Sequence, residues 1–281
     1  ESNSLHAYRE RVCLIQIATG GDTFLLDPLA VTDLSALGRL LDNPSITKVA
    51  HGSDYDVRCL HRDYGFTVRS LFDTEMAARF VGSSRTNLAT VLENVLGVEI
   101  PKSRQLQTSN WGHRPLSPLA MDYAINDVKF LPELGVELHM RLSTMGRLDW
   151  VMEECRRLEQ VRHAPPAQAE VMMLRIKGSS RLGPRSLAVL KQLFIFREEE
   201  GRRMDCPPSR VLTNEALITL SDSPDMELHK VSGLPVGIAS SAGEYIREAI
   251  HRGMCGPLVR RPRQPRNKPW EPDAQARVKL L

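Results

Sequence analysis

The sequence predicts an α/β domain with a mixed sheet, followed by a small domain made only of helices. A β-hairpin pattern opens the chain, and short apolar strands then alternate with helical segments, which together indicate the α/β class. Every patterned segment after a stretch rich in proline and alanine has helical periodicity, which indicates the second domain. A chain of 281 residues is long enough for two domains with buried cores.

The hairpin is expected at the start of the chain. Apolar runs at 11–18 and 22–27 flank Gly20 and Gly21, which are typical of the tight turn between paired strands. Thr32 is then predicted to cap a helix whose leucines recur with the period of a buried helical face.

Strands and helices alternate from there to the end of the first domain. Strands are expected at 46–51 and 70–73, and each is followed by a helical segment. The last helix of interest is predicted to begin at Ser117 and Pro118, because a serine cap followed by proline at the first helical position is a start signal. This order favours a mixed sheet with helices packed against it.

The second half has the pattern of a helical bundle. Residues 186–204 place apolar side chains on one side of a helix, and Thr213 is expected to cap another helix. The predicted organisation is a first domain at 1–160, a linker at 161–169, a helical domain at 170–253 and a basic tail at 254–281.

Composition narrows the class of protein. The chain is 42% hydrophobic and 25% charged, as in ordinary globular proteins, and no apolar run approaches the roughly 18 residues of a membrane span. Five scattered cysteines without a CxxC pair indicate reduced thiols, and with no signal-peptide pattern at the start they predict a cytoplasmic protein. The segment 259–268 holds five basic residues and no acid, which suits either phosphate contacts or a solvated end.

Candidate acidic residues follow the strands. Asp56 lies five residues after His51 and just past the strand at 46–51, while Tyr123 and Asp127 lie four residues apart on one helical face. Ligands of α/β sheets collect at the carboxyl ends of the strands. Gathered carboxylates repel each other unless cations lie between them, so a pair of Mg²⁺ or Mn²⁺ ions is expected. The alternative for each acid is structural, since aspartate in a first helical turn also complements the helix dipole.

The segments "KVAHGSDYDVRCL", "SLFDTEMAARFVG" and "YAINDV", in this order, resemble the ribonuclease D family of 3′–5′ exonucleases over residues 1 to about 155. The Y-x3-D spacing of Tyr123 and Asp127 is similar to the tyrosine branch of that superfamily. Residues 168 to about 253 are similar to the HRDC domain, an accessory nucleic-acid-binding unit in that family. The resemblance implies a ribonuclease H-like mixed sheet for the exonuclease domain.

The resemblance also implies roles for four residues. Glu1, Asp56 and Asp127 would bind the divalent ions, and Tyr123 would hold the attacking water through its hydroxyl group. A phenol with a pKa near 10 stays protonated at neutral pH, so it would act by hydrogen bonding.

The first family motif is D-x-E on a strand that precedes "CLIQ". Glu1 matches its glutamate, but the aspartate two residues earlier and its interior strand are not in the sequence, so we expect residues upstream in the natural protein. Asp73 and Glu75 also spell D-x-E, but they follow Asp56 instead of preceding "CLIQ". We therefore expect Asp73 to support the site or to have no role.

Substrate contacts are expected from a loop with basic, amide and aromatic side chains. These suit the phosphates and stacked bases of a single strand, and they are Lys102, Arg104, Gln107, Trp111 and Arg114. Trp111 has burial as an equal alternative. By analogy Gln16 is expected to face the terminal nucleotide, and His51 is a further candidate whose alternative is a structural role.

The leading interpretation is a metal-dependent exonuclease that trims the 3′ ends of single-stranded RNA. Family-typical substrates are tRNA precursors and other stable RNAs, and we expect a monomer. A DNA exonuclease stays open, because no residue visibly reads the 2′-hydroxyl group. A nucleic-acid-binding protein without catalysis also stays open, because the aspartate of the first motif is not in the sequence.

Overall fold

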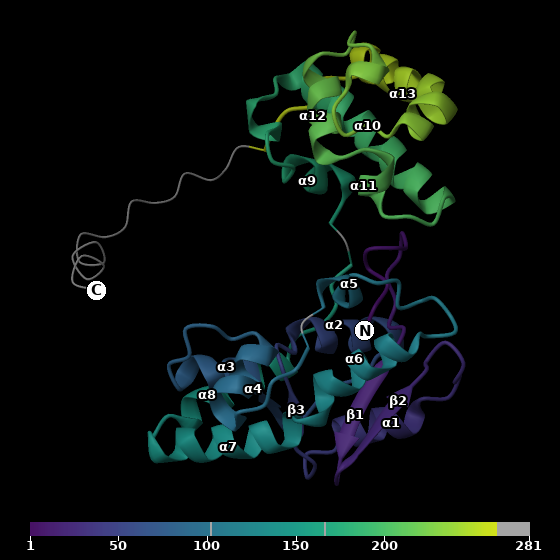
Figure 1. Ribbon diagram of the computed structural model, residues 1–281. Helices are drawn as coiled ribbons and strands as arrows, with labels where there is room; N and C mark the ends of the chain where they lie inside the picture. The colour runs from purple at the N-terminus through teal and green to yellow at the C-terminus, as the bar shows by residue number, and fades with distance from the viewer. Residues whose placement is uncertain (102, 166, 263–281) are drawn as a thin grey trace, which may run out of the picture. The chain divides into compact units, whose positions relative to one another are not determined.

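The computed structural model describes residues 1–101, 103–165 and 167–262. They fall into two compact units, the first made of Glu1–Pro166 with Met204–Pro207 and the second of Ala167–Arg203 with Pro208–Leu281. Lys102 and the part of the expected basic tail from residue 263 onward lie outside the described residues. Figure 1 shows the helices and strands of each unit.

The first unit mixes strands and helices, as predicted. Its strands are β1 (Ile15–Thr19), β2 (Asp22–Leu26), β3 (Lys48–Ala50) and β4 (Leu71–Asp73). Its helices are α1 (Ser35–Asp42), α2 (Asp54–Tyr64), α3 (Thr74–Phe80), α4 (Leu88–Leu96), α5 (Arg104–Gln107), α6 (Pro118–Lys129), α7 (Leu131–Thr144) and α8 (Leu148–Glu159).

The predicted hairpin is present. β1 and β2 pair antiparallel, with Ile15 opposite Leu26 at one end of the ladder. Gly20 and Gly21 have φ angles of 58° and 92°, which a two-residue hairpin turn requires and which side chains with a Cβ atom disfavour. Local sequence therefore determines this part of the fold.

The other two strands form a parallel pair. Lys48 lies opposite Leu71 and Ala50 opposite Asp73, so both strands end at the same edge. In the described residues the two pairs are separate two-stranded sheets, whereas the sequence predicted one mixed sheet. β1 and β3 exchange no ladder hydrogen bonds there, and α7 packs against both of them.

Capping residues define where the helices begin. Ser117 accepts a hydrogen bond from the backbone N–H of Ala120 (3.2 Å), and Pro118 is the first residue of α6, as predicted. The prediction for Thr32 was wrong, because α1 begins only at Ser35. The carboxylate of Asp33 accepts the Ser35 N–H there at 2.9 Å.

Apolar packing holds the helices of the first unit in place. Within it, α3, α4, α7 and α8 gather beyond β3, away from the hairpin (Figure 1). Leu134, Leu138 and Leu142 of α7 are fully buried there, and burial of each such side chain contributes roughly 1.5–3 kcal/mol. This cluster fixes α7 against its three neighbouring helices.

A second apolar cluster joins α6 to the hairpin. Ala120 and Ala124 of α6 are buried against Cys13, Leu14 and Trp111. Small side chains on this face let the helix lie close to both β1 and β2. Side chains on the neighbouring face of α6 are therefore left at the edge of this apolar cluster.

The second unit is a helical bundle, as predicted. Its elements are α9 (Ala169–Leu174), η1 (Ser179–Arg181), α10 (Pro184–Arg203), α11 (Pro208–Val211), α12 (Asn214–Asp222), η2 (Leu228–Lys230) and α13 (Val236–Cys255). Thr213 caps α12, as expected, by accepting the Ala216 N–H at 3.1 Å. α10 contacts α9, α11, α12 and α13, so it lies at the centre of the bundle.

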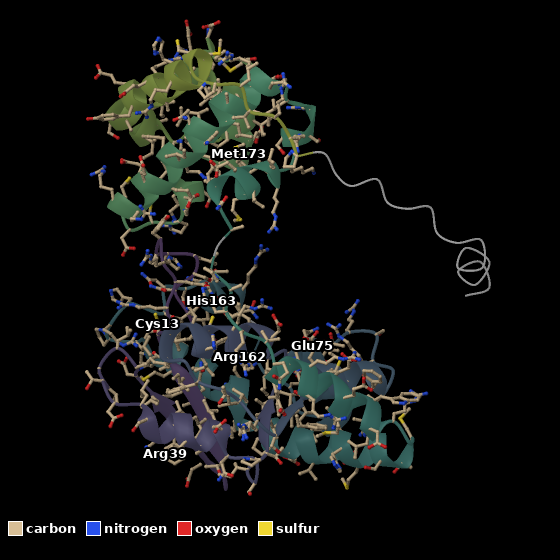
Figure 2. The ribbon with its side chains drawn as sticks, turned by 180° about the vertical axis from the view of Figure 1, so that it is seen from behind. Cys13, Arg39, Glu75, Arg162, His163 and Met173 are labelled. Carbon is tan, nitrogen blue, oxygen red and sulfur yellow. The ribbon has the colours of Figure 1, made fainter. Side chains whose placement is uncertain are left out.

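Each unit has a buried core of its own. Figure 2 labels Cys13 in the first unit and Met173 in the second, and both side chains are fully buried. Across the part of the chain that the structure describes, every helix is too short or too polar to cross a membrane.

Candidate active site

Tyr123 and Asp127 meet on one face of α6. Both are half-buried, because the neighbouring face of the helix packs on the hairpin. The Tyr123 hydroxyl donates a hydrogen bond to the Asp127 carboxylate and accepts one from the side-chain amide of Gln107. The helix spacing predicted from sequence therefore produces a direct contact between phenol and carboxylate.

Glu1 lies beside the segment that leads into β1. Its carbonyl oxygen accepts hydrogen bonds from the backbone N–H groups of Cys13 (2.8 Å) and Leu14 (3.2 Å). Its carboxylate is close enough to two others for their charges to interact, because Asp56 raises the pKa of Glu1 and Glu1 raises the pKa of Asp127. Glu1 is thus the electrostatic link between α2 and α6.

Asp56 lies in the first turn of α2. The Asp56 side chain is exposed to solvent. The surrounding protein nevertheless raises the pKa of its carboxylate, mainly by desolvation, and the charge of Asp73 raises this pKa further. We interpret Asp56 as a carboxylate that protein atoms surround on most sides without covering it.

Burial and mutual repulsion shift the protonation of the whole group. Burial is the largest cause for Asp127, whose pKa is raised to about 7, and the charge of Glu1 is the next. The hydrogen bond from Tyr123 partly offsets this increase. Burial, and then the charge of Asp127, raises the pKa of Tyr123 to about 12, so its hydroxyl stays protonated at neutral pH.

The three carboxylates fit divalent cations in chemistry and charge. Oxygen donors are the ligands that Mg²⁺ and Mn²⁺ prefer, and no basic side chain of the described residues contributes to the pKa of Glu1, Asp56 or Asp127. Within the described ranges, no three His, Cys, Asp or Glu side chains form a group tight enough to hold a metal. A closed cage is not required, because Mg²⁺ is commonly bound by one or two carboxylates together with waters and substrate phosphates.

A surface pocket elsewhere in the unit does not include this group. It lies between α4 and α7, and Asn94, Glu137 and Met140 contribute to its lining. None of the three carboxylates lines it. The candidate site is therefore identified by its grouped carboxylates, and it does not coincide with this pocket.

Two expected substrate contacts must be corrected. Trp111 is 1% exposed and packs inside the cluster under α6, so its ring offers no face to a base. Arg114 forms a bidentate ion pair with Asp27 (2.6 and 2.8 Å) and donates to the carbonyl of Cys13. Its guanidinium therefore ties the loop to the hairpin and is not available for phosphates.

The remaining candidates differ in their exposure and in the contacts that they make. Gln16 is half-buried on β1 opposite Leu25, and Arg104 and Gln107 are exposed on α5. His51 is half-buried, hydrogen-bonded through Nδ1 to Thr74 Oγ1 at 2.9 Å, and held also by the backbone of residue 86. Desolvation is the largest cause that lowers the pKa of His51, which favours its neutral imidazole.

Sequence reasoning missed the contacts that attach the first segment to α2. The Tyr55 hydroxyl donates to Glu10 and contacts Ser2 Oγ at 2.9 Å, and Arg62 of α2 pairs with Glu10. Asp63, next along α2, accepts the backbone N–H of residue 12 at 2.7 Å. These contacts join residues about 50 positions apart, so no local pattern could have indicated them.

Comparison with known proteins finds a family for each of the two units. A family model described as 3′–5′ exonuclease matches residues 1–143, and an HRDC domain model matches residues 186–250. A ribonuclease D of Gluconacetobacter diazotrophicus is 31% identical to the chain, over 98% of the chain and 70% of that protein. The chain belongs to the ribonuclease D family. A second ribonuclease D, from Acidiphilium cryptum, is 30% identical over 92% of the chain and 67% of that protein.

A solved ribonuclease D structure has the same architecture. The crystal structure of Escherichia coli RNase D, described as an exoribonuclease involved in structured RNA processing, superposes with a TM-score of 0.74 at 27% identity. The match covers 98% of this chain and 74% of that one. Membership of the ribonuclease D family makes the chain a 3′–5′ exoribonuclease, and it confirms both the resemblance and the α/β-plus-HRDC fold predicted from sequence.

Proposed function

We propose that the chain removes nucleotides from the 3′ end of single-stranded RNA with two divalent ions bound by Glu1, Asp56 and Asp127. The supporting observation is that these carboxylates come from three separate segments and lie near one another. Asp56 raises the pKa of Glu1, Glu1 raises the pKa of Asp127, and no basic side chain of the described residues lowers any of the three pKa values. Bound Mg²⁺ or Mn²⁺ would supply a nucleophilic water of lowered pKa and stabilise the leaving oxygen of the phosphodiester.

The protein's own part is to orient the reactants. The Tyr123 hydroxyl stays protonated because its pKa is about 12, so it can hold the attacking water by a hydrogen bond without acting as a base. Gln107 donates to the same oxygen and limits the directions in which that hydroxyl can point. Asp127 accepts its hydrogen in the absence of substrate.

Substrate contacts are proposed for exposed side chains around the site. Arg104 is exposed on α5, the helix that also carries Gln107, and a guanidinium suits the phosphates of a single strand. Lys102 is proposed by its charge alone, since it lies outside the described residues. The proposed substrates are stable RNA precursors, tRNA included, and E. coli RNase D acts in structured RNA processing. We further propose a cytoplasmic monomer, which size-exclusion chromatography with light scattering would test.

Digestion of end-labelled strands tests the proposal. A 5′-labelled single-stranded RNA and a matched DNA would be incubated with Mn²⁺ or with chelator, using the parent and the Asp127→Asn variant. We expect a ladder that shortens from the 3′ end of the RNA, only with Mn²⁺ and only with the parent. Equal digestion of the DNA would favour the DNA exonuclease, and digestion in chelator would exclude the metal assignment.

A further inference from the structure

The carboxylate of Asp73 connects the starts of two helices. It is 2% exposed, and its Oδ1 caps α3 by accepting the backbone N–H groups of Glu75 (2.9 Å) and Met76 (3.0 Å). The same carboxylate also accepts from the segment before α2. Its partners there are the backbone N–H of Gly52 (3.2 Å to Oδ1), the backbone N–H of Ser53 (2.7 Å to Oδ2) and the Ser53 hydroxyl (2.6 Å to Oδ2).

The start of α2 depends on this attachment. Ser53 occupies the N-cap position of α2, but its side chain makes no capping hydrogen bond within that helix. Its hydroxyl donates to Asp73 instead, and its side chain is 1% exposed. Gly52 has a φ angle of 66°, a left-handed conformation that lets the chain turn from β3 into the helix.

The geometry carries this attachment to the candidate active site. Asp56 follows Ser53 by three residues in the first turn of α2, so the direction of its carboxylate is set by how α2 begins. The parallel register places Asp73 opposite the last residue of β3, beside the segment that leads to Ser53. The charge of Asp73 is also strong enough at Asp56 to raise its pKa, which shows that the two carboxylates are near each other.

We propose that Asp73, through its bonds to Ser53, is a positioning residue that holds Asp56 in the orientation needed to bind a divalent ion. This inference rests on the proposed function, in which Asp56 is a metal ligand. Residues that support a metal ligand typically change metal affinity or activity by about 10- to 100-fold when they are replaced. Asp73 itself is fully engaged by backbone and hydroxyl donors, so it supports the ligand and does not bind the ion.

The two oxygens of Asp73 allow its two roles to be separated. Both bonds that cap α3 go to Oδ1, whereas the bonds from Ser53 go to Oδ2. Ser53→Ala removes the hydroxyl bond and leaves the α3 cap in place. Asp73→Asn weakens both the α3 cap and the attachment of Ser53. If Asp73 served only to cap α3, Ser53→Ala would leave the affinity for the metal ion unchanged.

Mn²⁺ binding and turnover would be measured for Ser53→Ala, Asp73→Asn and a control, Asp33→Ala. Asp33 is exposed and its carboxylate accepts the Ser35 N–H at the start of α1, so the control removes a carboxylate that bonds to a helix start without touching α2. Mn²⁺ affinity is read from the electron paramagnetic resonance signal of the free ion, and kcat and KM from digestion of labelled RNA. Melting temperatures report how far each variant is destabilised.

We expect Ser53→Ala to weaken Mn²⁺ binding or to lower kcat by about 10- to 100-fold, with KM for RNA unchanged. Asp33→Ala should keep the parental Mn²⁺ affinity and kcat even where its melting temperature falls as much. Parental Mn²⁺ affinity and kcat in Ser53→Ala would overturn the proposal, and this holds even if Asp73→Asn does not fold.

Two further variants separate this proposal from the one on which it rests. Asp56→Asn and Asp127→Asn should each lose Mn²⁺ binding and hydrolysis. If they do so while Ser53→Ala is normal, only the positioning role fails. If both retain Mn²⁺ binding and hydrolysis, the proposed metal site itself is wrong.

Discussion

At the scale of single residues, the proposed active site is a group of acids whose protonation the fold has changed. Glu1, Asp56 and Asp127 all have raised pKa values, and for each the largest cause is desolvation. A site of this kind is costly to ionise without a cation and favourable to ionise with one. The ionisation of these carboxylates and the stability of the folded chain should therefore both change with pH and with the concentration of divalent ions.

Replacing Asp127 by asparagine should remove activity and leave the fold intact. The amide keeps the size of the carboxylate but lacks the charge that would bind a divalent ion. We expect hydrolysis of RNA to fall by more than the roughly 100-fold typical of residues that only support a ligand. Turnover and thermal melting measure the two effects, and a variant that degrades RNA at the parental rate would show that the metal assignment is wrong.

The same residue predicts a pH dependence of stability in the metal-free protein. The pKa of Asp127 is about 7 in the folded chain, against an ordinary value of 3.8, so the folded state binds more protons between these values. The stability contributed by the neutral carboxyl is complete below about pH 4 and is lost as the pH rises through about 7. Glu1 and Asp56 are shifted in the same direction and reinforce the effect.

Melting temperatures measured in chelator from pH 5 to 8 would show this as a decline in the parent that is shallower in Asp127→Asn. Mn²⁺ should reduce the decline in the parent, because the bound ion favours the ionised carboxylates. Parallel curves for parent and variant would mean that Asp127 titrates normally.

Tyr123→Phe removes a single hydroxyl group from α6. Mn²⁺ affinity should survive, because the three carboxylates stay in place, and kcat should fall by roughly 10²–10⁴-fold. Tyr245→Phe is the matched control, since Tyr245 is 62% exposed in the second unit. Equal kcat values for both variants would return Tyr123 to a packing role.

At the scale of elements, close packing decides where the helices of the first unit lie. Gly135 is buried in the middle of α7, and a Cβ atom there would come within 2.9 Å of Val49 Cγ1 on β3. Glycine within a helix costs about 1 kcal/mol relative to alanine, so the exchange would be stabilising if space allowed. The contact with β3 therefore explains why glycine occupies this position.

Gly135→Ala should destabilise the protein by about 1–3 kcal/mol, because overpacking outweighs the gain in helix propensity. Val49→Ala opens the space that the new methyl group needs, so the double variant should recover part of the loss. Urea unfolding of the parent, both single variants and the double variant measures the coupling. Additive effects would show that α7 adjusts without pressing on β3.

At the scale of the whole molecule, the chain carries its chemistry and its expected accessory binding in different units. The three carboxylates and Tyr123 all come from the first unit, and the second is a bundle built around α10. Each unit has its own buried core. Activity and RNA affinity should therefore be separable by truncation.

A truncation after about residue 160 should still hydrolyse short RNA but bind longer RNA less well. The removed part includes the HRDC match at 186–250 and the basic segment 259–268, of which residues 263–268 lie outside the described part of the chain. For each RNA phosphate that only the removed part neutralises, the slope of log affinity against log salt should become shallower by about 0.7 on a single strand. Binding at several salt concentrations would measure it, and equal slopes would assign the second unit to partners other than RNA.

Local features of the sequence determined several elements and one half of the proposed site. The turn at Gly20 and Gly21 and the start of α6 at Ser117 follow from backbone preferences and capping, which act within a few residues. The spacing of Tyr123 and Asp127 placed them together for the same reason, since a helix brings residues four apart onto one face.

Only the tertiary structure decided which polar side chains serve the fold. Arg114 has the chemistry of a phosphate ligand, but Asp27, 87 residues away, binds it. Trp111 has the chemistry of a stacking platform but is buried under α6, and Asp73 caps its own helix but also binds Ser53, 20 residues earlier. A sequence pattern records side-chain chemistry, whereas the availability of that chemistry depends on partners that folding brings from distant parts of the chain.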